Sequence, residues 1–159
     1  MKDVKINYQI DWIKKHKAHL YHNYCKSKGN YILKKVFEIY DKKHERLVDL
    51  NIEFIKLIKE LLCIETELII DEEIFGTKHE YYIQVSKKYD CEIYLSGNGA
   101  KKYMTDENIN EIEKNGITHS YIEENPFNDH KYSALHYILI NGSEAVSELF
   151  KKQEIKIMQ

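Results

Sequence analysis

The stretch YLSGNGAKKYM, residues 94–104, carries the residues of this chain with the clearest chemical potential. A short apolar run ends there in two closely spaced glycines, which let a backbone approach a bound group closely. Backbone amides at the start of a following helix and nearby lysine ammonium groups attract anions, while serine and tyrosine hydroxyls can add hydrogen bonds. We therefore expect a loop that binds a phosphorylated small molecule. Its residues are Ser96, Gly97, Asn98, Gly99, Lys101, Lys102 and Tyr103.

The alternative for this loop is purely structural. Gly97-Asn98-Gly99 can turn the chain with positive φ and bind nothing. The stretch matches neither a phosphate-binding P-loop nor the Gly-x-Ser-x-Gly turn of hydrolases. Both interpretations stay open from the residues alone.

Catalytic residues cannot be assigned from the sequence. Ser96 and Cys91 are possible nucleophiles. His130 or His136, at the start of the last helical region, can act as a base at neutral pH if it lies near the loop. A structural position is the simpler interpretation for each histidine, and no oxyanion partner is recognisable.

His16, His19 and His22 are the other histidine cluster, and they repeat every three residues. On a helix this spacing rotates each side chain by about 60° from the one before it. A metal site needs ligands held on one face, with a carboxylate nearby. A solvated basic face fits the spacing better, so we expect no metal and no cofactor. The role of these three histidines and of His136 stays open.

The loop needs a strand to present it. Residues 92–95 form a short β-prone run directly before it, and residues 66–70 and 117–122 form two more. Strands that alternate with helices at this spacing are typical of βαβ units, in which the strands are parallel. Ligands bind such sheets beyond the carboxyl ends of the strands. Ser96 to Gly99 would lie at that edge.

Most of the remaining chain has the apolar spacing of helices, with steps of three and four residues. The predicted helices cover residues 9–26, 31–41, 47–61, 76–88, 106–115 and 132–152, with Gly142-Ser143 dividing the last. We therefore predict a single α/β domain over residues 1–159. It would consist of a helical part, residues 1–62, and a βαβ part, residues 63–159, with a small parallel sheet of about three strands.

Composition indicates a soluble globular protein, because hydrophobic residues are 43% and charged residues 31%. No apolar run approaches the ~20 residues of a membrane span, and the N-terminus lacks the apolar core of a signal peptide. Cys25, Cys63 and Cys91 are odd in number and widely spaced, which favours free thiols in a reducing compartment. We expect a cytoplasmic protein without a membrane partner.

Charge is unevenly distributed along the chain. Residues 1–50 carry 12 Lys/Arg against 6 Asp/Glu, and the rest carries 12 against 20. A solvated basic part beside an acidic part explains this split. The more specific alternative is that the basic part forms a binding site for an anion. The net charge of −2 and the lack of a recognisable module argue against nucleic-acid binding.

Three segments carry a family pattern: TKHEYYIQVSKKYDCEIYLSGNGAKKYM, NGITHSYIEENPF and YSALHYILINGSEA. They resemble the WbqC-like family, which is associated with bacterial surface-polysaccharide clusters, including O-antigen biosynthesis. The positions that fit the family's motifs are Lys78, Glu80, Tyr94, Leu95, Ser96, Gly97, Gly99, Tyr103, Ser133 and Gly142. Tyr81, Ala100 and His136 stand where the family has an arginine, a glycine and an acid.

The resemblance runs from about Trp12 onward, without the family's proline- and tyrosine-containing first strand and the aspartate-rich segment after it. We therefore expect a member that lacks the family's N-terminal part. The resemblance implies a transferase for acyl or aminoacyl groups that acts on a nucleotide-linked sugar. The alternative is a non-catalytic relative that acts as an accessory or protein-interaction subunit. Because a missing strand leaves a sheet edge open, we also expect a homodimer or a partner protein.

Overall fold

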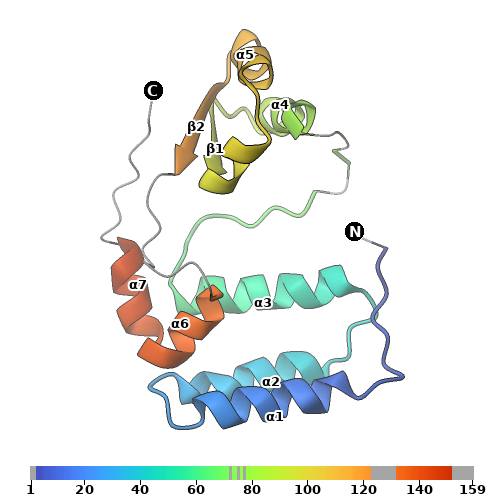
Figure 1. The fold of residues 1–159 in the computed structure, drawn as a ribbon, viewed down its shortest axis with the longest axis vertical. Helices are drawn as coiled ribbons and strands as arrows, with labels where there is room; N and C mark the ends of the chain where they lie inside the picture. The colour runs from blue at the N-terminus through green and yellow to red at the C-terminus, as the bar shows by residue number, and fades with distance from the viewer. Residues whose placement is uncertain (1–2, 72, 75, 77, 123–131, 152–159) are drawn as a thin grey trace. The chain divides into compact units, whose positions relative to one another are not determined.

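The computed structural model of this chain describes residues 3–71, 73–74, 76, 78–122 and 132–151. The chain divides into two compact units, each with its own apolar core. The helical unit comprises Met1–Thr66 and Phe127–Lys152, and the sheet unit comprises Glu67–Pro126 and Gln153–Gln159. Figure 1 follows the chain through both units.

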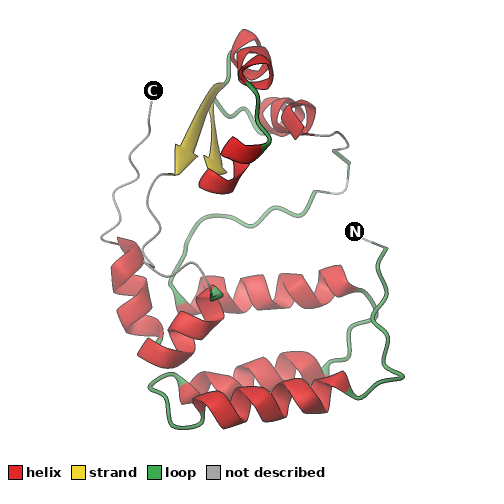
Figure 2. Cartoon of the chain, in the orientation of Figure 1, coloured by secondary structure: helices red, strands yellow, loops and turns green. Residues whose placement is uncertain are grey.

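Helices make up the helical unit, as Figure 2 shows for its described residues. In chain order they are α1 (Trp12–Tyr24), the 3₁₀ helix η1 (Asn30–Ile32), α2 (Leu33–Asp41), α3 (Leu47–Leu61), α6 (Ala134–Asn141) and α7 (Ser143–Lys151). The helices predicted over residues 9–62 are thereby confirmed. Helix α2 contacts α1 and α3, while α7 contacts α3 and α6. The buried core is Ile32, Leu33, Val36, Ile39, Leu50, Leu57, Leu62, Ile138, Leu139 and Val146.

The segment before α1 is attached to the turn between α2 and α3. The Ile6 N–H donates to the Glu45 carbonyl at 2.9 Å, and the Leu47 N–H donates to the Val4 carbonyl at 2.9 Å. Lys5 Nζ also lies 2.7 Å from the Glu45 carboxylate. These contacts hold the segment against the start of α3.

Gly29 brings α6 against the turn after α1. Its N–H donates to the Leu139 carbonyl at 2.9 Å. A Cβ at residue 29 would lie only 2.3 Å from the Ile138 carbonyl oxygen and 2.8 Å from the Leu139 Cα. Glycine is therefore required here by close backbone approach.

Helices α6 and α7 belong to the helical unit, although we predicted them within the βαβ part over residues 63–159. Gly142 separates them with a φ of 88°, as the sequence indicated for this position. The buried side chains of Ile138, Leu139 and Val146 explain the placement, because the helical unit's core is the apolar cluster that they complete.

The sheet unit places helices α4 (Lys78–Lys88) and α5 (Asp106–Lys114) beside strands β1 (Ile93–Gly97) and β2 (Thr118–Ile122). The 3₁₀ helix η2 (Asn98–Lys102) follows β1 directly. Thr105 caps α5 in a reciprocal capping box with Asn108, and Gly116 ends it with a φ of 78°. The core between the helices and the sheet is Ala100, Met104, Ile112 and Ile117, with Tyr82, Ile83, Tyr94, Ile109 and Tyr121 packed against it.

Strands β1 and β2 are parallel, in a register that pairs Tyr94 with His119 and Ser96 with Tyr121. Paired residues of neighbouring strands point to the same face of a sheet, and alternate residues share that face. Tyr94, Ser96, His119 and Tyr121 therefore share the face of the sheet that α4 and α5 cover.

The predicted α/β class holds, but the prediction of about three strands is wrong for the described residues, which form a two-stranded sheet. Residues 66–70 form no strand. Ile69 and Ile70 are 50% and 53% exposed, so their β-branched side chains bury little surface there. Strand formation depends on a pairing partner and on burial more than on local preference, and the repeated βαβ pattern is not confirmed. None of the helices in the described residues has the length and apolar character needed to cross a bilayer.

Candidate functional site

The candidate site lies in the sheet unit, at the carboxyl ends of β1 and β2. We predicted Ser96 and Gly97 in a loop after a strand ending at residue 95, but the strand continues through both. Pairing with β2 causes this extension, because Gly97 still lies opposite Ile122 in the parallel register. The expected loop is instead the short 3₁₀ helix η2, which Asn98 begins.

Ser96 and His119 form the central polar pair of this site. Ser96 Oγ lies 2.9 Å from His119 Nε2. Their exposed fractions are 6% and 8%, so the hydrogen bond is shielded from water. Burial lowers the pKa of His119, and the nearby Glu113 charge opposes this only in part. The imidazole is therefore neutral at pH 7.

The second ring nitrogen of His119 decides what the pair can do. Nδ1 is buried and has no hydrogen-bond partner among the described residues. A neutral imidazole carries one N–H, so either a lone pair or an N–H is left without a partner at Nδ1. Orphaned buried N–H groups are the rarer of the two in proteins. The arrangement thus favours an Nε2–H that donates to Ser96, which leaves the Ser96 hydroxyl proton free to bond elsewhere.

The direction of this hydrogen bond is opposite to that in a Ser-His-Asp triad. There an acid accepts the Nδ1–H, so that Nε2 can take the serine proton. The described residues place no acid on Nδ1 of His119. Ser96 is therefore better arranged as a hydrogen-bond donor to a ligand than as a nucleophile.

Gly97 and Gly99 do not have the positive φ that the turn alternative required. Gly97 has a φ of −67°, and the described glycines with positive φ are Gly116 and Gly142. A Cβ added at residue 97 or 99 would meet no atom of the described residues within 4 Å. In that part of the chain, neither backbone strain nor packing demands glycine here. The open space beside both residues is accessible to a ligand.

Lys101 and Lys102 bring positive charge to this end of the sheet unit, and both are exposed. Lys101 Nζ lies 5.0 Å from the centre of the Tyr121 ring, within the range of a cation–π contact. It is thereby held over the same sheet face that carries Ser96 and His119. This ammonium group can therefore attract an anionic group that binds beyond the strand ends.

Tyr103 is exposed, but its hydroxyl is not free. Its oxygen lies 3.0 Å from that of Tyr82 on α4, and this hydrogen bond raises the pKa of Tyr82 to about 12. The Tyr82 ring stacks on Tyr94 with centroids 4.3 Å apart. Tyr103 therefore connects the end of η2 to α4 and to the sheet.

His119, Tyr82 and Tyr121 are the site residues that sequence reasoning missed. Residues 117–122 were recognised as a strand, and alternation alone puts His119 and Tyr121 on one face. Pairing that strand with β1 in parallel would have put His119 on the face of Ser96. His119 is thus the histidine that faces Ser96, and we had considered only His130 and His136.

The other chemically interesting residues lie elsewhere. His136 Nδ1 bonds the Tyr24 hydroxyl at 2.7 Å within the helical unit, while His130 lies outside the described residues. The Cys91 thiol is exposed and contacts the Tyr89 carbonyl at 3.5 Å. The part of the chain that the structure describes contains no group of three or more His, Cys, Asp or Glu side chains that could hold a metal ion.

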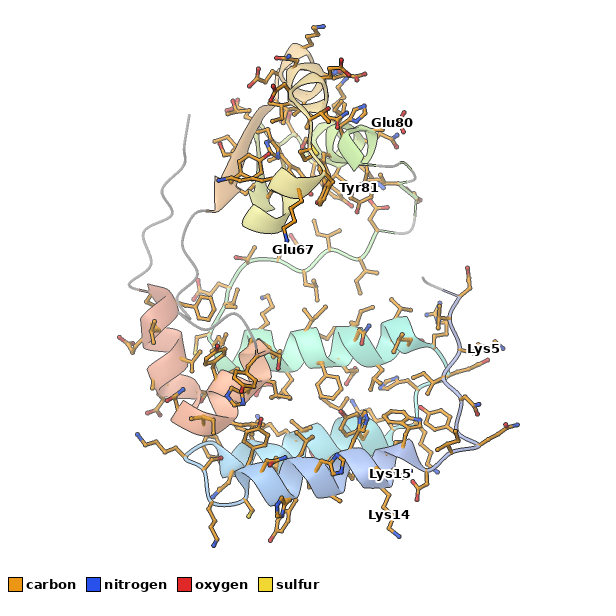
Figure 3. The ribbon with its side chains drawn as sticks, viewed as in Figure 1. Lys5, Lys14, Lys15, Glu67, Glu80 and Tyr81 are labelled. Atoms are coloured by element: carbon orange, nitrogen blue, oxygen red, sulfur yellow. The ribbon has the colours of Figure 1, made fainter. Side chains whose placement is uncertain are left out.

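Two departures from the family pattern have local explanations. Ala100 is 5% exposed and its methyl group fills the sheet unit's core, where a glycine would leave space. Tyr81 lies on α4 next to Glu80 (Figure 3). The centroid of its ring lies 6.2 Å from that of the Tyr82 ring, in an edge-to-face arrangement. Tyr81 thus extends the aromatic group that supports the site.

A family model described as "WbqC-like protein family" matches residues 1–148. The chain belongs to the WbqC-like protein family. The match begins at residue 1, ahead of the point near Trp12 where the motifs suggested that the resemblance starts. It includes every residue of the candidate site in this WbqC-like protein. Comparison with curated proteins and with solved structures found no match.

Proposed function

We propose that this WbqC-like protein is a transferase that binds a nucleotide-linked sugar at the carboxyl ends of β1 and β2. The transferred group would be an acyl or aminoacyl group, and the product would serve surface-polysaccharide biosynthesis. Nucleotide-linked sugars are made in the cytoplasm, so we place the protein there. Family membership supports the general setting, and the arrangement around Ser96 supports the ligand class.

The buried Ser96–His119 pair at the strand ends is the observation that carries this proposal. Ser96 and His119 satisfy each other, but a buried polar atom without a partner is costly, and Nδ1 of His119 has none among the described residues. Titratable groups with perturbed pKa values are often found at functional sites. The open space at Gly97 and Gly99 and the charge of Lys101 add room for a phosphate and attraction toward it. Parallel strand ends are also where α/β proteins bind nucleotides.

The reaction that fits this geometry is a direct transfer between two bound substrates. The bond between the acyl carbon and its carrier breaks, and the acyl carbon bonds to an oxygen or nitrogen of the sugar. The proton that this sugar atom loses passes to the carrier atom that leaves. Ser96, oriented by His119, donates a hydrogen bond to the acyl oxygen as negative charge develops there.

Isothermal titration calorimetry with nucleotides and nucleotide-linked sugars tests the proposal. We expect saturable binding of at least one nucleotide-linked sugar and weaker binding of the free nucleotide. Ser96→Ala and His119→Asn should each reduce affinity or turnover, while Thr118→Ala, at an exposed position of β2, should not. No binding by any compound in the panel would contradict the proposed ligand class.

A non-catalytic role remains the second candidate because of the other face of β1. Ile93 and Leu95 point away from the core side and are 45% and 37% exposed. Apolar side chains exposed on a small sheet favour a partner protein or a second copy of this chain. Light scattering at tens of micromolar distinguishes a dimer from a monomer, and a monomer without ligand binding would leave neither function supported.

A further inference from the structure

A cavity of about 460 Å³ lies within the helical unit, at one end of the α1, α2 and α3 helices. The N-terminal segment forms one of its walls, held there by the backbone hydrogen bonds to Glu45 and Leu47. Figure 3 shows Lys5 on this segment. The residues that line the cavity are Val4, Lys5, Ile6, Trp12, His16, Tyr40, Leu47, Leu50, Asn51 and Phe54.

Four rings, those of Trp12, His16, Tyr40 and Phe54, lie in the walls of this cavity. The Trp12 and Tyr40 rings meet edge to face with centroids 5.7 Å apart, and Tyr40 meets Phe54 in the same way at 5.3 Å. His16 adds a fourth ring, 5.1 Å from Trp12. Such clusters favour a further ring as guest, because edge-to-face contacts add to the burial of apolar area.

The charge of the walls also restricts the guest. None of the lining residues carries a carboxylate, and the Lys5 ammonium group is already paired with Glu45 at 2.7 Å. By contrast, Asp41 lines two other cavities of the helical unit, of about 540 and 470 Å³. The aromatic cavity therefore suits an uncharged molecule. Its volume is within the usual range of small-molecule sites, roughly 300–1,000 Å³.

Polar groups in the walls are available for a hydrogen bond. The Tyr40 hydroxyl and the Asn51 amide make no hydrogen bond to any residue that the structure describes. Burial raises the pKa of the Tyr40 phenol, so it stays protonated and remains a donor as well as an acceptor at neutral pH. A half-buried phenol without a protein partner is a suitable anchor for the polar end of a guest.

We propose that this cavity binds an uncharged aromatic ring that carries a hydroxyl group, with the ring packed among Trp12, Tyr40 and Phe54 and the hydroxyl bonded to Tyr40. This site is independent of the proposed transferase function, since all its residues lie in the helical unit. Failure of one proposal leaves the other intact.

The chain itself supplies a reporter for this site, because Trp12 is its only tryptophan. Excitation at a wavelength that tyrosine does not absorb makes the emission specific to the cavity. We expect 4-methylphenol to change this emission saturably, with a Kd of about 1 mM or tighter, as suits so small a ligand. N-acetyltryptophanamide in the same titration corrects for absorption and for collisional quenching.

Variants and analogues test the two parts of the proposal. Tyr40→Phe keeps the ring and removes the hydroxyl, so 4-methylphenol should bind about 3- to 10-fold more weakly, without loss of melting temperature. Tyr132→Phe, at an exposed tyrosine outside this cavity, is the matched control and should bind as the wild type does. Toluene and 1-hexanol should bind more weakly than 4-methylphenol to the wild type.

Three results would overturn the proposal. If the change in Trp12 emission does not saturate as 4-methylphenol is added, the cavity does not bind the ring. If Tyr40→Phe binds 4-methylphenol as tightly as the wild type does, the assigned hydrogen bond does not form. The same follows if toluene binds the wild type as tightly as 4-methylphenol does. Tighter binding of 1-hexanol than of 4-methylphenol shows that the cavity takes an aliphatic chain instead.

Discussion

Ser96 of β1 and His119 of β2 share a buried hydrogen bond of 2.9 Å between Oγ and Nε2, although they lie on different strands. Removal of the hydroxyl leaves both nitrogens of a buried imidazole without a partner. We therefore expect Ser96→Ala to lower the free energy of unfolding by about 1–3 kcal/mol. Chemical denaturation followed by circular dichroism measures this. Thr118→Ala, at an exposed position of β2, is the control, and an equal loss in both variants would contradict the explanation.

The lowered pKa of His119 predicts a particular dependence of stability on pH. Because burial holds this pKa below its unfolded value of about 6.5, the unfolded state binds a proton before the folded state does. The contribution of His119 to stability is therefore complete above pH 6.5. It is lost progressively as the pH falls from there toward the folded pKa.

His119→Asn removes this titration, so its stability should fall less between pH 7 and pH 5 than that of the wild type. Urea unfolding at a series of pH values measures the difference. Other histidines contribute to both proteins equally and cancel. Parallel pH profiles for the two proteins would show that the folded and unfolded states titrate alike at this position.

Lys101 and Lys102 supply the charge expected to attract a phosphate. The double substitution of both by alanine removes exposed ammonium groups and should leave the melting temperature nearly unchanged. If each forms a charge-assisted hydrogen bond to phosphate, affinity for a nucleotide-linked sugar should fall by about tenfold or more. Calorimetry measures this, with Lys114→Ala as a control that removes one ammonium group from the end of α5. If the double substitution leaves the affinity unchanged, the two lysines have no role in binding.

Gly29 lies in a crowded environment and Gly97 in an open one, so an alanine substitution at each should affect stability differently. Gly29→Ala places a Cβ 2.3 Å from the Ile138 carbonyl oxygen, so the backbones must move apart. We expect a loss of about 1–3 kcal/mol, as for other overpacked sites. A Cβ at residue 97 meets no atom of the described residues within 4 Å, and Gly97 has a φ of −67°. Gly97→Ala should therefore be neutral or stabilising by up to about 1 kcal/mol. Thermal unfolding of both variants checks the contrast.

Gly97→Ala also distinguishes an effect on ligand binding from an effect on stability. If a ligand approaches the backbone at Gly97, Gly97→Ala should weaken its binding even though the protein is as stable as before. A variant with unchanged affinity would show that the space beside Gly97 stays empty when the ligand binds.

Local patterns in the sequence located the helices and indicated the segment that follows β1 as a candidate site. The three- and four-residue spacing of apolar residues located α1, α2 and α3, because a helix buries one face whatever it packs against. Gly142 marked one helix end, and the helix predicted over residues 106–115 stops just before Gly116, since the positive φ found at both glycines is a local property of the chain. The residues from Ser96 to Tyr103 were likewise recognisable from their types and order alone.

Tertiary structure alone decided what depends on partners distant in the chain. Residues 66–70 have the β-branched content of a strand but are exposed, because a strand forms only where another strand and a core accept it. Gly29 lies between the helices predicted over residues 9–26 and 31–41, but the need for glycine there comes from the backbone of Leu139, 110 positions later in the chain. His119 became a partner of Ser96 only through the parallel register of β1 and β2, which brings two atoms to 2.9 Å although their residues are 23 positions apart in the chain.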